Sequence, residues 1–321
     1  MRVSSFSLAL SISLNQVALA SLAAKRAKGP WLALDTDFPD PSFIKGEDGT
    51  WYAFGTNSNG KRVQVATSPD FVSWTLLDKE ALPTFAEWET DVYHWAPDVI
   101  QRDDGRYVLY YSGDSKQSRL CIGSAVSAGI DPSGPYVPNP QPLSCRKDQG
   151  GSIDPSGFLD TDGSRYVVFK VDGNSIGHGG DCNNGVAPLQ PTPIMLQKVA
   201  ADGFTPVGEA VQILDRDDSD GPLVEAPNLI LHDGTYFLFY STHCFTDREY
   251  DIRYATASSV TGPYTKTGVQ LVKTGDYNLT SPGGGTVCPC GDRMLFHGFC
   301  GGKRCTYAAD ILISGTSVNF V

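Results

Sequence analysis

The chain has 321 residues, of which 40% are hydrophobic, and its formal net charge at pH 7 is −11. This length is enough for one large domain or two small ones, and the composition argues against a disordered or a membrane-embedded protein. The negative charge argues against a nucleic-acid partner, which would require a basic surface.

The N-terminus has the features of a secretory signal. Arg2 precedes a short apolar run, and the small residues Ala18 and Ala20 suit a cleavage site. We therefore expect residues 1–20 to be a signal peptide, residues 21–30 to be a short and potentially processed segment, and residues 31–321 to form one secreted domain. The run is too short to cross a membrane, so we expect no membrane partner. The alternative is the disordered N-terminus of a cytosolic protein.

All eight cysteines lie beyond residue 20, which favours disulfides formed in an oxidising compartment. Eight cysteines allow 105 pairings, so the sequence does not give the connectivity. Only Pro289 separates Cys288 from Cys290, and we expect each of them to pair elsewhere, for example with Cys300 or Cys305. A zinc site in this region is the alternative, although the usual C-x-x-C spacing is missing.

An internal repeat organises the rest of the chain. Each unit has an anchor proline, then an Asp-Gly turn, then an aromatic strand, and Asp-Gly between apolar runs is a strong hairpin signal. The four turns are Asp48-Gly49, Asp104-Gly105, Asp162-Gly163 and Asp233-Gly234, and a degenerate fifth copy runs from Gly283 to His297.

Further strands with an exit turn recur in the same order, as in residues 66–68, 124–126 and 254–257. Five units of several strands each predict an all-β fold, a five-bladed β-propeller. A β-sandwich is the alternative, and it does not explain so regular a period.

In a propeller the heads of the repeating units meet at one end of the central axis. These heads carry Asp40 between two prolines, Trp95 with Asp98, Asp154, and Glu225. Acids are almost never fully buried unpaired, so their shared register predicts a pit of carboxylates. Such a pit suits glycosidic bond hydrolysis, which needs one carboxylic acid and one carboxylate. Turn caps and a calcium site are the alternatives.

The chain resembles glycoside hydrolase family 43, the five-bladed propeller enzymes that act on arabinose- and xylose-containing plant polysaccharides. The resemblance rests on four motifs at residues 38–42 (Phe-Pro-Asp-Pro-Ser), 95–99 (Trp-Ala-Pro-Asp-Val), 151–156 (Gly-Ser-Ile-Asp-Pro-Ser) and 224–227 (Val-Glu-Ala-Pro). It implies that Asp40 is the general base, that Glu225 is the general acid, and that Asp154 tunes and orients this acid. It also implies inversion, with the base and acid carboxyl groups about 6.5–9.5 Å apart.

Further residues follow from the same resemblance. Phe38 and Trp95 are predicted to form an apolar wall for a sugar ring, with core packing between blades as the alternative. Arg304 matches an arginine that contacts substrate in relatives, with a surface ion pair as the alternative. Many relatives hold a water-coordinated metal ion on the axis with a histidine, where this chain has Gly284. We therefore expect no cofactor, and a calcium ion at the hub is in doubt.

The Gly-Ser-Ile-Asp-Pro form of the third motif looks more like the arabinofuranosidase and xylosidase branch of the family, so we expect an α-L-arabinofuranosidase. We also expect the protein to be a monomer that acts on an arabinose- or xylose-containing polysaccharide or oligosaccharide. The alternatives are a β-xylosidase, an endo-arabinanase and a non-catalytic carbohydrate-binding propeller. Fructan-cleaving propellers are disfavoured, since they usually place a cysteine after the acid, where this chain has Ala226.

Overall fold

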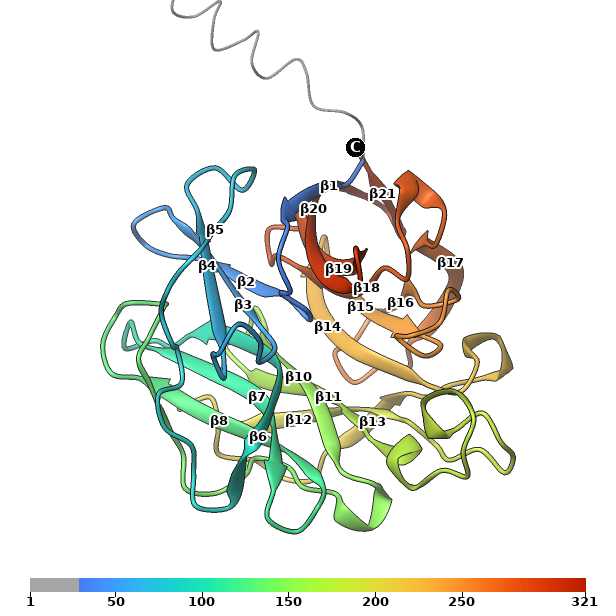
Figure 1. Cartoon of the computed structure of the whole chain (residues 1–321), viewed down its shortest axis with the longest axis horizontal. Helices are drawn as coiled ribbons and strands as arrows, with labels where there is room; N and C mark the ends of the chain where they lie inside the picture. The colour runs from blue at the N-terminus through green and yellow to red at the C-terminus, as the bar shows by residue number, and fades with distance from the viewer. Residues whose placement is uncertain (1–28) are drawn as a thin grey trace, which may run out of the picture.

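The computed structural model describes residues 29–321, so the predicted signal peptide lies outside the described residues. Five antiparallel sheets surround a central axis, and this confirms the predicted five-bladed β-propeller (Figure 1). Within the described part of the chain, no helix is long and apolar enough to cross a membrane.

Each blade is a meander whose strands follow one another along the chain. Blade 1 contains β2 (Ser42–Lys45), β3 (Trp51–Gly55), β4 (Gln64–Ser68) and β5 (Thr75–Leu76). Blade 2 contains β6 (Glu89–Gln101), β7 (Tyr107–Ser115), β8 (Leu120–Ser127) and β9 (Tyr136–Pro138). Blade 3 contains β10 (Ser152–Leu159), β11 (Arg165–Val171), β12 (Ile194–Val199) and β13 (Val211–Leu214). Blade 4 contains β14 (Val224–His232), β15 (Thr235–Thr242), β16 (Asp251–Ala257) and β17 (Thr265–Lys273).

Blade 5 joins the two ends of the fold. Its sheet contains β18 (Gly283–Val287), β19 (Arg293–Cys300) and β20 (Lys303–Ser314), and β21 (Ser317–Phe320) pairs with the end of β20. Its outer strand is β1 (Trp31–Leu34), which comes from the start of the domain and pairs with β20 (Figure 1). Five short 3₁₀ helices lie in the connections: η1 (Lys147–Gln149), η2 (Gly173–Ile176), η3 (Asp181–Asn183), η4 (Asp218–Asp220) and η5 (Asp276–Asn278).

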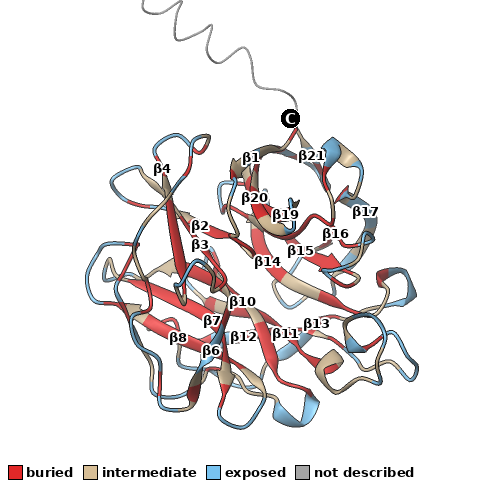
Figure 2. Cartoon of the chain, in the orientation of Figure 1, coloured by how far each residue is buried: buried red, intermediate tan, exposed pale blue. Residues whose placement is uncertain are grey.

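The Asp-Gly turns form as predicted, between the first and second strands of blades 1 to 4. Their glycines have φ between 77° and 83°, a left-handed conformation that glycine adopts without a steric penalty. Apolar side chains of adjacent strands are buried between the sheets, so the strands are mostly buried and the turns exposed (Figure 2).

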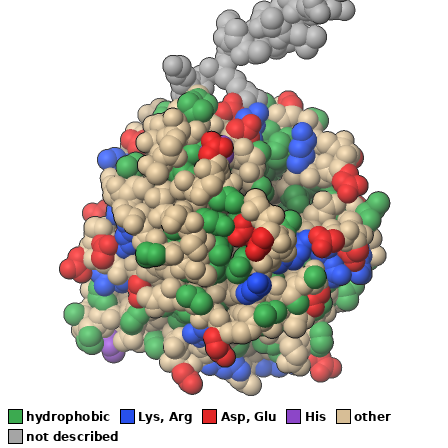
Figure 3. Space-filling model, turned by 180° about the vertical axis from the view of Figure 1, so that it is seen from behind, with side chains coloured by type: hydrophobic (Ala, Val, Ile, Leu, Met, Phe, Trp, Pro, Cys, Tyr) green, Lys and Arg blue, Asp and Glu red, His purple; other side chains and the backbone are tan. Residues whose placement is uncertain are grey.

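The first strands of the five blades surround the axis. Residues in or next to them line an axial cavity of about 30 Å³, and the other ends of the same strands line a wider, mostly apolar cavity of about 440 Å³. Acidic and basic side chains are interspersed on the face shown in Figure 3, and no continuous basic patch is visible there.

All eight cysteines are paired: Cys121–Cys145, Cys182–Cys244, Cys288–Cys290 and Cys300–Cys305. The expectation that Cys288 and Cys290 pair elsewhere is therefore wrong. One intervening residue allows a Cα–Cα distance of 5.1 Å, which lies within the usual range for a disulfide. Because no thiol is free, no cysteine is available to bind zinc, which argues against the alternative of a zinc site.

Candidate active site

The head of every blade has the same strained backbone. The residues at this point have φ values between 45° and 61°, and in blades 2 to 5 the pairing of the first strand shifts register around them. Such bulges redirect side chains and are common next to active sites. The five residues are Asp40, Ala96, Asp154, Ala226 and Gly284, and all of them line the small axial cavity.

Asp40 is held as a carboxylate by its neighbours. Its Oδ1 lies 3.2 Å from Arg304 Nη1, and its Oδ2 accepts a hydrogen bond of 2.5 Å from the Thr56 hydroxyl. Burial acts to raise the pKa of Asp40, but Arg304 and the hydrogen bonds outweigh it and hold this pKa well below the usual range. Asp40 is therefore ionised at any pH at which the protein is expected to work.

His297 supports the backbone of Asp40. Its Nδ1 accepts a hydrogen bond of 3.1 Å from the Asp40 N–H, and burial lowers the pKa of the ring. A neutral ring with the proton on Nε2 satisfies both observations. His297 Nδ1 also lies 3.2 Å from Asp40 Oδ1, and this contact helps to lower the pKa of Asp40. His297 thus supports both the conformation and the charge of Asp40.

Asp154 has the opposite electrostatic environment. Its N–H donates to Ser112 Oγ, and its Oδ2 accepts a hydrogen bond of 3.0 Å from the Ala226 N–H. Burial, followed by the charge of the nearby Glu225, raises the pKa of Asp154. Asp154 therefore retains a proton more readily than an isolated carboxyl group.

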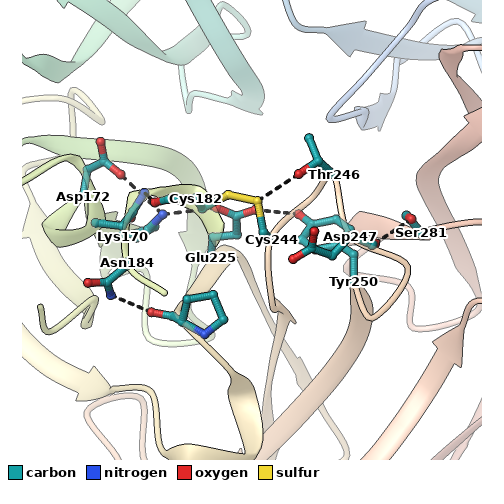
Figure 4. Close-up of a disulfide and its surroundings, with 12 residues drawn as sticks. Lys170, Asp172, Cys182, Asn184, Glu225, Cys244, Thr246, Asp247, Tyr250 and Ser281 are labelled. Atoms are coloured by element: carbon teal, nitrogen blue, oxygen red, sulfur yellow. Dashed lines mark hydrogen bonds and ion pairs between the residues drawn. A yellow bond between two sulfur atoms is a disulfide. The ribbon is translucent and has the colours of Figure 1, made fainter. Parts of the chain in front are cut away.

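Glu225 lies between two hydrogen-bond donors, Lys170 and Tyr250 (Figure 4). The Tyr250 hydroxyl donates to Oε1 at 2.8 Å, and Lys170 Nζ lies 3.1 Å from Oε2. Lys170 is completely buried and also pairs with Asp172 at 3.4 Å. Glu225 itself keeps 13% of its side chain exposed, so it is held in place but still accessible.

The arrangement brings together Asp40, which is held ionised, and Asp154, whose pKa is raised beside Glu225. An ionised carboxylate and a protonated carboxyl group are the two groups that acid–base cleavage of a glycosidic bond requires. Arg304, which was predicted to contact substrate, contacts Asp40 and lies 5.0 Å from the Phe245 ring, with 21% of its side chain exposed.

Of the two residues predicted to form an apolar wall, only one is accessible. Trp95 is half-buried beside Tyr93, with their ring centroids 4.6 Å apart. The prediction for Phe38 is wrong, because its ring is fully buried in the core. The ring packs against Gly55, where a Cβ atom would lie 2.8 Å from it, so the glycine leaves room for the phenylalanine inside blade 1.

The sequence reasoning missed Lys170, Tyr250 and Thr56, and it assigned no role to His297. A signal was present for Lys170 and His297. Each follows the aromatic residues within the second strand of its blade, at the point where Ser112 and Ser241 stand in two other blades. Comparing the repeats at this position would have identified Lys170 as the only lysine.

The residue at the head of blade 5 offers no ligand to a metal ion on the axis. Position 284 lacks a side chain, and a Cβ atom there would lie 2.8 Å from His297 Nδ1. The carboxylates of Asp40 and Asp154 already accept the hydrogen bonds described above. In the described chain, the clusters of side chains close enough to share a metal contain only disulfide-bonded cysteines beside an aspartate: Asp35, Cys300 and Cys305, and Cys288, Cys290 and Asp292.

Comparisons with known proteins agree with this fold. The extracellular endo-α-(1→5)-L-arabinanase 1 of Bacillus subtilis is 32% identical over 273 residues, which cover 82% of this chain and 75% of that protein. The xylosidase/arabinosidase 43A of Humicola insolens is also 32% identical, but over only 46% of this chain and 50% of that protein. The native arabinanase Arb43A of Bacillus subtilis has a solved structure with a TM-score of 0.70 and 26% identity, covering 91% of this chain and all of that one.

A second solved structure, of a thermostable family-43 glycoside hydrolase, has a TM-score of 0.76 and 25% identity, with coverage of 90% of this chain and 94% of that one. The sequence model described as "Glycosyl hydrolases family 43" matches residues 32–311, which is nearly all of the described chain. The chain therefore belongs to glycosyl hydrolase family 43.

Proposed function

We propose that this glycoside hydrolase cleaves α-1,5-linked L-arabinan, and that it does so within the chain, as an endo-arabinanase. The observation that carries the catalytic part is the contrast between Asp40, which is held ionised, and Asp154, whose pKa is raised by burial and by the neighbouring Glu225. The assignment of the substrate is supported by the similarity to arabinanases, which favours endo action over the arabinofuranosidase activity expected from the sequence.

In the proposed mechanism, Glu225 donates its proton to the glycosidic oxygen as the bond to the anomeric carbon breaks. A water molecule attacks that carbon from the opposite face, and Asp40 accepts the proton of this water. Asp154 orients Glu225 and, through the proximity of two carboxyl groups, helps to keep a proton in the pair. The configuration at the anomeric carbon is then inverted.

An activity screen with matched variants tests this proposal. Glu225→Gln and Asp40→Asn are expected to reduce the rate on debranched arabinan by about 10²–10⁴-fold, the usual contribution of positioned acid–base catalysis. Asp162→Asn, in an exposed turn of blade 3, is the control and is expected to retain the wild-type rate.

The products of the same screen decide between the alternatives. Endo action gives mixed oligosaccharides early in the reaction, whereas an exo-acting arabinofuranosidase releases arabinose and also cleaves aryl α-L-arabinofuranoside. Preferential cleavage of aryl β-xyloside would indicate a xylosidase, a reading favoured by the similarity to the Humicola enzyme. If the wild-type protein binds arabinan but cleaves none of these substrates, it is a carbohydrate-binding propeller.

We further propose that the protein is a secreted monomer that needs no resident metal. Secretion is supported by four disulfides and by the extracellular relatives. Treatment with a chelator is expected to leave the rate on arabinan unchanged. A loss of activity that calcium restores would contradict the metal-free proposal, and size-exclusion chromatography checks the monomer.

A further inference from the structure

Four of the five blade heads are held by the same hydrogen bond. In each, the backbone N–H of the residue with positive φ donates to a side chain in or just after the second strand of the preceding blade. Blade 5 is the preceding blade for blade 1, because the blades form a ring. The four contacts are Ala96 N–H to Thr56 Oγ1 at 2.8 Å, Asp154 N–H to Ser112 Oγ at 2.9 Å, Gly284 N–H to Ser241 Oγ at 3.0 Å and Asp40 N–H to His297 Nδ1 at 3.1 Å.

Lys170 stands at this position in blade 3. It pairs with Ile153 in the sheet, as Ser112 pairs with Trp95 and Ser241 pairs with Glu225. A lysine ammonium group has three donors and no acceptor, so it cannot receive the N–H of Ala226. That N–H donates to Asp154 Oδ2 instead.

The presence of Lys170 in place of a hydrogen-bond acceptor has two consequences for the site. The hydrogen bond from Ala226 fixes Asp154 beside Glu225, and the side chain of Lys170 is directed to Glu225 Oε2. A buried cation is costly unless it is paired, and Lys170 is paired with both Glu225 and Asp172. Burial acts to lower the pKa of Lys170, but Glu225, Asp172 and Asp154 outweigh it. Asp172, at 3.4 Å, remains an anionic partner of Lys170 when Glu225 carries its proton.

The two oxygens of Glu225 are therefore not equivalent. Oε2 faces an ammonium group, which cannot accept a proton. Oε1 faces the Tyr250 hydroxyl, which can rotate to act as donor or acceptor. Only Oε1 has a partner that is compatible with a protonated oxygen.

We propose that Lys170 is a positioning residue that confines the transferable proton of Glu225 to Oε1 and stabilises the carboxylate that remains after proton transfer. The inference rests on the proposed role of Glu225 as the general acid. In this step the proton leaves Oε1 for the glycosidic oxygen, the bonding electrons of the broken C–O bond move to that oxygen, and the new negative charge of Glu225 lies 3.1 Å from the ammonium group. Because the charge develops only during the reaction, the ion pair contributes more to the transition state than to the ground state.

The test compares leaving groups of different basicity. Lys170→Met is expected to lower kcat/KM on arabino-oligosaccharides by about 10²-fold, because their alkoxide leaving groups depend on proton transfer. Dinitrophenyl α-L-arabinobioside needs little protonation, so its kcat/KM is expected to fall less than about 10-fold. Lys198→Met, an exposed lysine on the neighbouring strand β12, is the control and is expected to change neither rate.

Two further variants keep the test decisive. Lys170→Ser restores the hydroxyl group found at this position in blades 1, 2 and 4, and it is expected to fold but to show the same leaving-group dependence as Lys170→Met. If Lys170→Met fails to fold because Asp172 is left unpaired, Lys170→Met with Asp172→Asn replaces it.

The outcomes separate the two proposals. If Glu225→Gln retains activity on arabino-oligosaccharides, the proposed function fails. If Glu225→Gln is inactive but the Lys170 variants slow both leaving groups equally, or neither of them, the inference about Lys170 is overturned.

Discussion

Asp40 has the neighbours of a residue whose charge is fixed before substrate arrives. Arg304 and Thr56 each contact one of its oxygens, and His297 binds its N–H. These three residues come from blades 5 and 1, so the ring of blades must close before the environment exists. The low pKa of Asp40 is thus a property of the assembled site rather than of the motif around it.

Arg304→Met tests this environment through the pH dependence of activity. Arg304 lowers the pKa of Asp40, so its removal raises that pKa, and the proposed base then becomes protonated at a higher pH. We expect the acidic limb of the kcat/KM profile to move to higher pH, with the largest relative loss at acidic pH. Arg248→Met, an exposed arginine in the connection that also carries Phe245, is the control. An unchanged acidic limb in Arg304→Met would show that the arginine does not set the charge of the base.

At the scale of elements, the connections after β11 and β15 are joined by the Cys182–Cys244 disulfide, which Figure 4 shows together with Glu225. The connection after β11 is also anchored by Asn184, whose side chain donates to the Pro222 carbonyl at 2.7 Å. The residue after Cys244 is Phe245, whose ring lies next to Arg304. The disulfide therefore fixes connections of blades 3 and 4 that reach the candidate site.

Cys182→Ser with Cys244→Ser is expected to affect both stability and substrate binding. The disulfide spans 62 residues, and a chain-entropy estimate for a closed loop of this size is about 4 kcal/mol. We expect a lower melting temperature and a KM for arabinan that rises more than kcat falls. The control, Cys121→Ser with Cys145→Ser in blade 2, removes a disulfide that spans 24 residues, and it is expected to lower the melting temperature without raising KM. Equal KM values in the two double variants would contradict a role of the Cys182–Cys244 connection in binding.

At the scale of the whole molecule, the propeller is closed by β1, which adds the start of the domain to the last blade. Leu34 at the end of β1 is buried in a cluster with Phe38, Phe43 and Ala308, which joins blades 1 and 5. The closure keeps Asp40 of blade 1 next to Arg304 of blade 5, although 264 positions separate them in the sequence. We therefore expect stability and activity to be lost together when this junction is weakened.

Leu34→Ala tests the junction. Removing a buried leucine side chain is expected to lower the free energy of unfolding by about 2–5 kcal/mol. Leu32→Ala on the same strand is the control, because Leu32 is 47% exposed and its removal leaves no cavity. Urea unfolding followed by tryptophan fluorescence and by residual activity is expected to give coincident transitions in both variants. Loss of activity well before the fluorescence change would contradict the coupling between closure and site.

The sequence by itself determined the repeating fold and the positions of the three acids. The Asp-Gly turns and aromatic strands depend on local backbone conformation and on the alternation of side chains, which a short stretch of chain already specifies. The motif around Asp40 likewise places this acid at the head of a blade, and the same reasoning applies to Asp154 and Glu225. The family resemblance then assigned them roles, which remain predictions.

Only the tertiary structure decided which residues meet across blades. Lys170 and Tyr250 reach Glu225 from different elements, and Phe38 is drawn into the core by the space above Gly55. The pairing of Cys288 with Cys290 depended on the backbone distance between them. These contacts form because ring closure brings together segments that are far apart in the sequence, and no local pattern encodes the distance between two blades. The axis is the clearest example: Gly284 could be read from the sequence, but not that His297 occupies the space a side chain at this position would need.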